Sequence, residues 1–165
     1  MKNKSCCFLG HTSESILFNN ESSKQFRIFK EHLYNEILRL ITQNDVTHFI
    51  TGVDQGFQLY GAGIIEELKK QWIQITLECA IPYEEQAANW HEPMRNRYFD
   101  IIGHCDKETL LETHYSPDSL KKCNEYLVDN SDFVVALWDG VDSVTGNIVK
   151  YAEDNCKAVI VINPN

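Results

Sequence analysis

The 165-residue chain lacks several features that define membrane, secreted or nucleic-acid-binding proteins. No apolar run approaches the ~18 residues that a membrane span needs, and the apolar patch near the N-terminus is too short for a signal peptide. Positive charge is also scarce, because 15 Lys and Arg against 24 Asp and Glu give a net charge of −9. Binding to nucleic acid or to an anionic membrane needs a basic face, so neither is expected as a partner.

The six cysteines lack the spacing of a CxxC motif. A chain of this length buries enough surface to fold without disulfides, and structural disulfides belong to oxidising compartments. We therefore expect reduced thiols and a cytoplasmic protein. The neighbours His104, Cys105 and Asp106 carry metal-binding groups, but consecutive side chains point in different directions, so no metal is expected.

The chain does contain a regular alternation of apolar runs and amphipathic segments, without a repeat or a linker. Ser22 and Gln25 fit a capping box before the first long helix. This alternation predicts one domain over residues 1–165, an α/β, Rossmann-like three-layer α/β/α sandwich with a mostly parallel sheet. The expected strands are 6–9, 46–51, 73–81, 108–112, 133–138 and 158–162, and the expected helices are 26–41, 59–70, 93–102, 116–129 and 145–155.

Ligands of such folds bind beyond the carboxyl ends of the strands, so the residues that follow each strand are candidate site residues. Gly52 and Gly56 lie four apart between a strand and a helix, where exposed N–H groups and the helix N-terminus favour an anion such as phosphate. A plain strand–helix turn explains the same glycines. In the loop 143–147, Thr145 either caps the helix or binds phosphate, and Gly146 allows a ligand to approach.

Four further side chains at strand ends are candidates for ligand contact or chemistry. His11 is interpreted either as a ligand or acid–base group or as an ordinary turn residue. Trp138 either stacks on a ligand or belongs to the core. With His11, Asp54 and Asp139 are the acid–base candidates that strand ends provide.

These loops, in this order, resemble the SLOG superfamily of Rossmann-like proteins, and more closely its YpsA-like branch. The resemblance rests on the segments 7–11, 47–52, 78–83, 128–132, 138–140 and 145–152. It implies a nucleotide or ADP-ribose derivative as ligand, and the branch has no firmly assigned reaction. The ligand-binding residues expected are Gly10, His11, Thr12, Gly52, Val53, Gly56, Gln58, Pro82, Tyr83, Trp138, Asp139, Gly140, Thr145, Gly146 and Asn147.

The chain departs from its apparent relatives at three places. The relatives look to carry Arg at the position of Thr12 and Asp at the position of Gln58. They often have two glycines where this chain has Ser143-Val144. A cation, a candidate acid and a close backbone approach are thereby lost. LOG-type phosphoribohydrolase activity is not expected, because the chain lacks the full pattern of a Gly-rich loop followed by a glutamate that the LOG hydrolases look to need. DNA binding of the DprA kind is not expected either, because a net charge of −9 gives little attraction to phosphodiester chains.

The leading hypothesis is a module that binds or senses a nucleotide-derived small molecule. A hydrolase that cleaves an N-glycosidic or phosphate bond of a nucleotide is one alternative. A regulatory protein-interaction module with a decayed pocket is another. Oligomers are common among such folds, so a homo-oligomer is left open.

Overall fold

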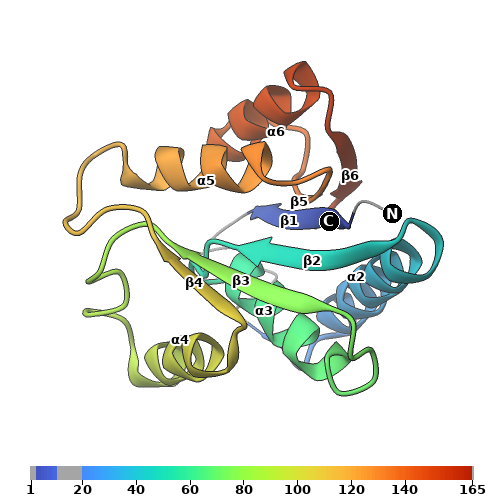
Figure 1. Cartoon of the computed structure of the whole chain (residues 1–165), viewed down its shortest axis with the longest axis horizontal. Helices are drawn as coiled ribbons and strands as arrows, with labels where there is room; N and C mark the ends of the chain where they lie inside the picture. The colour runs from blue at the N-terminus through green and yellow to red at the C-terminus, as the bar shows by residue number, and fades with distance from the viewer. Residues whose placement is uncertain (1–2, 11–19, 165) are drawn as a thin grey trace.

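The computed structural model describes residues 3–10 and 20–164. Its strands form one parallel sheet in the order β4-β3-β2-β1-β5-β6 (Figure 1). The strands are β1 (Lys4–Gly10), β2 (Val46–Thr51), β3 (Thr76–Ile81), β4 (Lys107–Leu110), β5 (Phe133–Leu137) and β6 (Ala158–Ile162). The helices are α2 (Lys24–Gln43), α3 (Phe57–Leu68), α4 (Glu92–His104), α5 (Ser119–Asp129) and α6 (Val144–Asp154).

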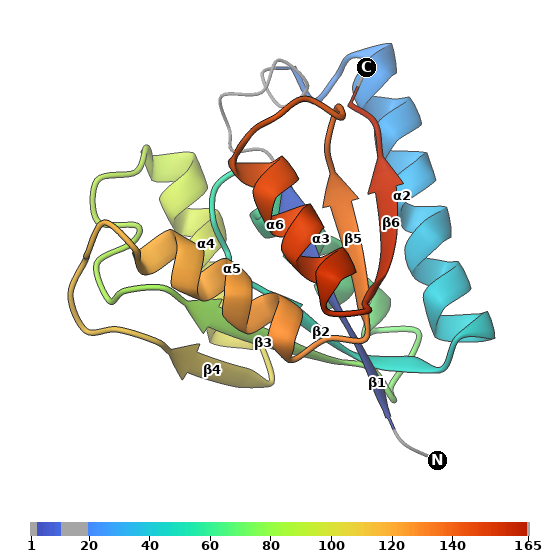
Figure 2. The same ribbon diagram turned by 90° about the horizontal axis from the view of Figure 1, so that it is seen from above.

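The helices form a layer on each side of the sheet. Helices α2, α3 and α4 cover one face, and α5 and α6 cover the other (Figures 1 and 2). The predicted three-layer α/β/α sandwich is therefore confirmed. Strand β1 lies between β2 and β5. The strand that follows β1 in the sequence is β2, on one side of it, and the strand that follows β5 is β6, on the other side, so the strand order reverses between β1 and β5. Parallel sheets open a ligand crevice at such a switch point, beyond the carboxyl ends of the strands.

Strand β1 shows how an apolar run supplies both faces of the sheet. Side chains alternate along a strand, so Cys6 and Phe8 pack toward α2–α4 while Cys7 and Leu9 pack toward α5 and α6. Phe8 stacks on Phe49 with ring centroids 6.1 Å apart. This double burial explains why β1 reads as continuously apolar rather than alternating.

The helix starts differ from the prediction at two caps. Ser23 caps α2, because its side chain accepts a hydrogen bond from the Phe26 N–H at 3.0 Å; the predicted capping box on Ser22 is wrong by one residue. Ser143 caps α6 by accepting from the Gly146 N–H at 3.0 Å, so Thr145 is not the cap. For α2, the prediction chose Ser22, whose hydroxyl is next to the true cap. For α6, it allowed Thr145, whose hydroxyl lies inside the first turn of the helix.

Two other boundaries were predicted too early. Strand β3 begins at Thr76 rather than at Ile73, because residues 69–75 form turns and Ile73 is exposed. Helix α5 begins at Ser119 rather than at Ser116, whose N–H instead donates to the Ser119 hydroxyl at 2.8 Å. Within the described part of the chain, no helix has the length and apolar character to cross a membrane.

Candidate functional site

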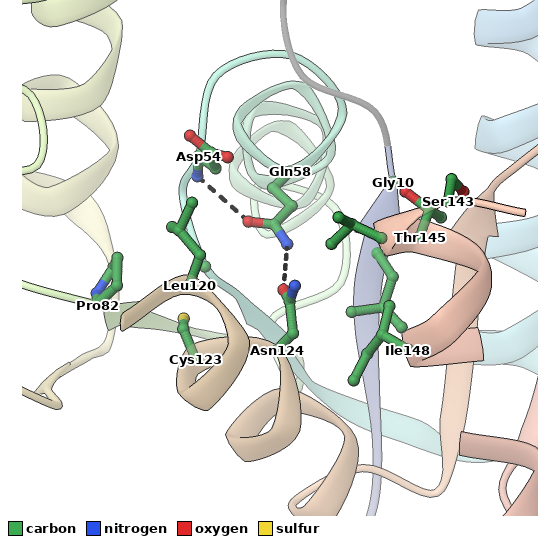
Figure 3. Close-up of a pocket in the computed structure, with 13 residues that line it drawn as sticks. Gly10, Asp54, Gln58, Pro82, Leu120, Cys123, Asn124, Ser143, Thr145 and Ile148 are labelled. Atoms are coloured by element: carbon green, nitrogen blue, oxygen red, sulfur yellow. Dashed lines mark hydrogen bonds between the residues drawn. The ribbon is translucent and has the colours of Figure 1, made fainter. Parts of the chain in front are cut away.

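A pocket of about 320 Å³ opens at the carboxyl ends of β1, β2 and β3, between α5 and α6 (Figure 3). Six of the residues that sequence reasoning selected line it: Gly10, Gly52, Asp54, Gln58, Pro82 and Thr145. The pocket lies at the switch point of the sheet, which is where this fold class binds ligands.

The other selected residues lie outside this lining. His11 and Thr12 fall outside the described residues. Asn147 lines a groove of about 650 Å³ between α5 and α6 that shares four residues with the pocket, namely Leu120, Asn124, Val144 and Ile148. The remaining selected residues are Val53, Gly56, Tyr83, Trp138, Asp139, Gly140 and Gly146, and their ligand contacts stay predictions.

Gln58, at the start of α3, forms the floor of the pocket. Its Oε1 accepts from the Asp54 N–H at 3.3 Å, and its Nε2 donates to Phe8 O at 3.3 Å and to Asn124 Oδ1 at 3.4 Å (Figure 3). A Cβ on Gly52 would stand 2.6 Å from Gln58 Oε1, so this glycine leaves room for the amide. Gln58 therefore ties α3 to β1 and α5, and its amide is held within the protein.

The loop between β2 and α3 is held in a strained conformation. The buried Thr51 hydroxyl donates to Gln58 O at 3.0 Å and accepts from the Val53 N–H at 3.3 Å. Val53 adopts a φ of 51°, which is unfavourable for a β-branched residue, and Gly56 has a φ of 91° that favours glycine. Strain of this kind persists where surrounding contacts enforce it, and it clusters at ligand-binding loops.

Asp54 is the one ionisable carboxylate in the described lining of the pocket. Its Oδ1 accepts a hydrogen bond from the Gln55 N–H at 2.9 Å. Burial raises the pKa of Asp54, and the Gln55 N–H opposes that rise only in part. The site thus contains a carboxylate with reduced access to water, and no Lys, Arg or His belongs to the described lining.

Two glycines that were predicted as ligand contacts also make room for protein side chains. A Cβ on Gly10 would stand 2.7 Å from Phe57 Cδ1 and 2.9 Å from Leu137 Cβ. A Cβ on Gly146 would stand 3.0 Å from Trp138 Cζ2. The Trp138 indole N–H donates to Val141 O at 2.8 Å. Protein packing thus accounts for glycine at both positions, and the ligand contacts predicted for Gly10, Trp138 and Gly146 stay predictions.

The first turn of α6 forms one wall of the pocket. Ser143, Val144 and Thr145 line it, and the Ser143 side chain binds the Gly146 N–H. The first turn of a helix leaves N–H groups without intrahelical partners, and the helix dipole places positive potential there. This wall is therefore suited to an anion, as the sequence predicted for the 143–147 loop.

Sequence reasoning missed the wall that α5 provides. Leu120, Cys123 and Asn124 project from one face of α5 into the pocket (Figure 3). Their spacing of three and four residues could have placed them on one helix face. Nothing local could have placed that face across the strand ends, because the contact depends on how α5 crosses the sheet.

The described residues contain no group of three or more His, Cys, Asp and Glu side chains that could hold a metal ion. All six cysteines are free thiols, and four of them are buried in the two cores of the sandwich. The arrangement can therefore bind a small molecule through helix N–H groups, hydroxyls, one carboxylate and an apolar wall.

Comparison with known proteins identifies a matching family. The model of the YspA SLOG family matches residues 6–164. An uncharacterised SPbeta prophage-derived protein, YoqJ of Bacillus subtilis, is 29% identical over 136 residues, which cover 75% of this chain and 80% of that protein. A UPF0398 protein of Ligilactobacillus salivarius is 25% identical over 79% of this chain and 72% of its own length. The UPF0398 protein YpsA of Bacillus subtilis is 24% identical over 72% of this chain and 67% of its own length.

Proposed function

The chain belongs to the YspA SLOG family, and on that premise we propose that it binds a nucleotide-derived small molecule, such as an ADP-ribose-like ligand, as a binding or sensing module. One observation carries the proposal. A pocket at the switch point of the sheet has the first turn of α6 on one side and the strained loop before α3 on the other.

The two sides of the pocket suit the two halves of such a ligand. The N–H groups of Val144 and Thr145 lie in the first turn of α6, where a helix supplies no intrahelical partner, and with the hydroxyls of Ser143 and Thr145 they can bind phosphate. Leu120, Cys123 and Ile148 form an apolar surface on which a base or sugar can pack. At about 320 Å³ the pocket is at the small end of the range for small-molecule sites, and the adjoining α5–α6 groove extends it.

The proposal is tested by thermal unfolding of the purified protein with AMP, ADP-ribose and NAD. A ligand that binds the native state at a hundredfold excess over its Kd stabilises the protein by about 2.7 kcal/mol. We expect at least one of the three to raise the Tm. A panel without any shift at millimolar concentration would contradict the proposal.

A matched pair of variants locates the binding. Val144 begins α6, is 76% exposed and lines the pocket, so Val144→Glu places a carboxylate where the phosphate is expected without burying it. An acidic residue in the first turn suits the helix dipole, so the fold should be retained. Val141→Glu adds the same charge at an exposed position outside the pocket. We expect the Val144→Glu protein to lose the ligand-induced shift and the Val141→Glu protein to keep it.

Cleavage of a nucleotide is the second candidate function, and the position of Asp54 favours it. Of the three acid–base candidates from the sequence, Asp54 lines the pocket, Asp139 is exposed outside it, and His11 lies outside the described residues. A carboxyl group with a raised pKa can exchange a proton near neutral pH more readily than an ordinary one. Chromatography of the same ligands after long incubation tests this candidate, and unchanged ligands would contradict it.

A further inference from the structure

The start of α3 already has an anion from the chain itself. The Asp54 carboxylate accepts from the Gln55 N–H at 2.9 Å, and the Asp54 carbonyl accepts from the Leu59 N–H at 3.0 Å. The α3 cap, Gly56, contributes no side-chain cap bond. Asp54 therefore lies where sequence reasoning placed a phosphate, and its negative charge repels a second anion at that end of the pocket.

The opposite end of the pocket has a different charge character. Ser143, Val144 and Thr145 carry no formal charge, and they lie on the first turn of α6. Asp54 and the α6 turn thus give the pocket one anionic end and one end rich in neutral donors. A ligand that carries both hydroxyls and phosphate can enter favourably in one orientation, with its phosphate toward α6.

The Asp54 carboxylate still has hydrogen-bonding capacity for a ligand. Gln55 engages Oδ1, and Oδ2 has no hydrogen-bond partner within residues 3–10 and 20–164. The neighbouring Gln58 has no comparable freedom, because its amide oxygen and nitrogen are both engaged by protein groups. A carboxylate accepts hydrogen bonds and donates none, so it selects hydroxyl groups and rejects phosphate.

We propose that Asp54 is a specificity-determining residue that accepts hydrogen bonds from the vicinal hydroxyls of an unmodified ribose and excludes phosphate from the α3 end of the pocket. This inference rests on the proposed function, because it requires that the pocket binds a nucleotide-derived ligand. The role of Asp54 also determines which ligands the pocket selects. Ribonucleosides with a 5′-phosphate bind, whereas their 2′-deoxy and 2′-phosphorylated forms are disfavoured.

The experiment is a calorimetric titration with three probes, AMP, 2′-deoxy-AMP and adenosine 2′,5′-bisphosphate. Hydrogen bonds to a charged group make a large contribution to binding, so we expect AMP to bind at least tenfold more tightly than 2′-deoxy-AMP. We expect the bisphosphate to bind at least tenfold more weakly than AMP, because its 2′-phosphate meets the Asp54 charge. This comparison uses the unaltered protein and does not depend on the folding of a variant.

Two isosteric variants assign the discrimination to Asp54. Asp54→Asn keeps an oxygen that can accept from the Gln55 N–H but removes the charge, so AMP and 2′-deoxy-AMP should bind within about threefold of each other and the bisphosphate should gain affinity. Asp132→Asn removes the same charge from an exposed carboxylate that also accepts a backbone N–H, from Ser5, but lies outside the pocket and outside the predicted site residues. The Asp132→Asn protein should discriminate as the unaltered protein does.

The outcomes separate this inference from the proposed function. Binding of AMP and 2′-deoxy-AMP with equal affinity would overturn the role of Asp54 and leave the proposed function standing. Discrimination that persists in the Asp54→Asn protein would do the same. Absence of binding by every probe, together with ADP-ribose and NAD, would overturn both.

Discussion

The two faces of the sheet are built from different side chains, although β1, β2, β3 and β5 each contribute to both. The face under α2, α3 and α4 combines aliphatic side chains with buried aromatic rings, and the rings of Phe8, Phe29, Phe49 and Phe57 lie within about 6 Å of a neighbouring ring. The face under α5 and α6 is filled with cysteine, alanine, valine, leucine and isoleucine. The face under α5 and α6 opens at its carboxyl edge into the pocket.

The α5 face also buries a carboxylate. Glu78 on β3 accepts from Tyr126 of α5 at 2.6 Å, from Thr109 of β4 at 3.0 Å, and pairs with His48 of β2 at 3.1 Å. Burial alone would raise the pKa of Glu78, but the hydrogen bonds from His48, Tyr126 and Thr109 and the charge of Lys107 lower it to about 2. Hydrogen bonds to Glu78 thus hold α5 in place, whereas α3 is held by packed aromatic rings. The two faces therefore differ in how they hold their helices, and the pocket lies on the face that α5 and α6 cover.

Replacing adjacent residues of β1 should give the largest contrast between the faces. Phe8→Ala removes a buried ring from the aromatic face and should lower the free energy of unfolding by about 3–5 kcal/mol. Cys7→Ala removes one sulfur atom from the pocket face and should cost about 1 kcal/mol. Urea denaturation measures both, and equal losses would show that the two faces contribute alike.

The next largest loss of stability is expected at Gly10, the last residue of β1. Gly10→Ala forces a Cβ to within 2.7 Å of Phe57 and 2.9 Å of Leu137, so we expect a loss of about 1–3 kcal/mol from overpacking. Gly63→Ala is the control, because a Cβ there meets no atom within 4 Å in the middle of α3. Higher helix propensity should make that control about 0.4–1 kcal/mol more stable. A harmless Gly10→Ala would contradict the packing role assigned to this glycine.

The Glu78 cluster predicts a smaller effect that depends on pH. The pKa of Glu78 is lowered in the folded state from the ordinary value of 4.5 to about 2. Its contribution to stability is therefore full above pH 4.5 and disappears as the pH falls toward 2. Glu78→Gln should cost about 1–2 kcal/mol at neutral pH, and the stability of that protein should fall less steeply between those two pH values.

The exposed Glu67, which pairs with Lys70 on the surface of α3, provides the control for that titration. Glu67→Gln should change stability by less than about 0.5 kcal/mol at every pH, because exposed ion pairs contribute little. Parallel stability curves for the Glu78→Gln protein and the unaltered protein would show that Glu78 does not hold α5.

Much of the architecture was predictable from the sequence, because it depends on local patterns. The last strand was predicted at residues 158–162, where the structure has it, since a run of β-branched residues there is bounded by turns. Ile73 was misplaced in a strand because an exposed apolar residue has the same pattern as a buried one. Six pocket-lining residues were predictable because parallel strands bring their ends together.

The rest of the site depends on contacts between distant segments. The sequence showed Gln58 as a change from the family pattern, but not that its amide bonds to β1 and to α5. It showed Gly146 as room for a ligand, but not that a Cβ at this position would also meet the Trp138 ring. Such directions follow from helix crossings, which local spacing does not specify.

We propose that the ligand binds in the pocket beside α5 and α6 and not on the aromatic face. The aromatic side has a hollow of its own, of about 350 Å³, lined among others by Tyr34, Tyr60 and Arg97. Hydrogen–deuterium exchange distinguishes the two sites when it is measured with and without a saturating concentration of whichever of AMP, ADP-ribose and NAD raises the Tm. We expect slower exchange in residues 52–58 and 143–148 and no change in α2. Slower exchange confined to α2, α3 and α4 around that hollow, or no change in any segment, would contradict it.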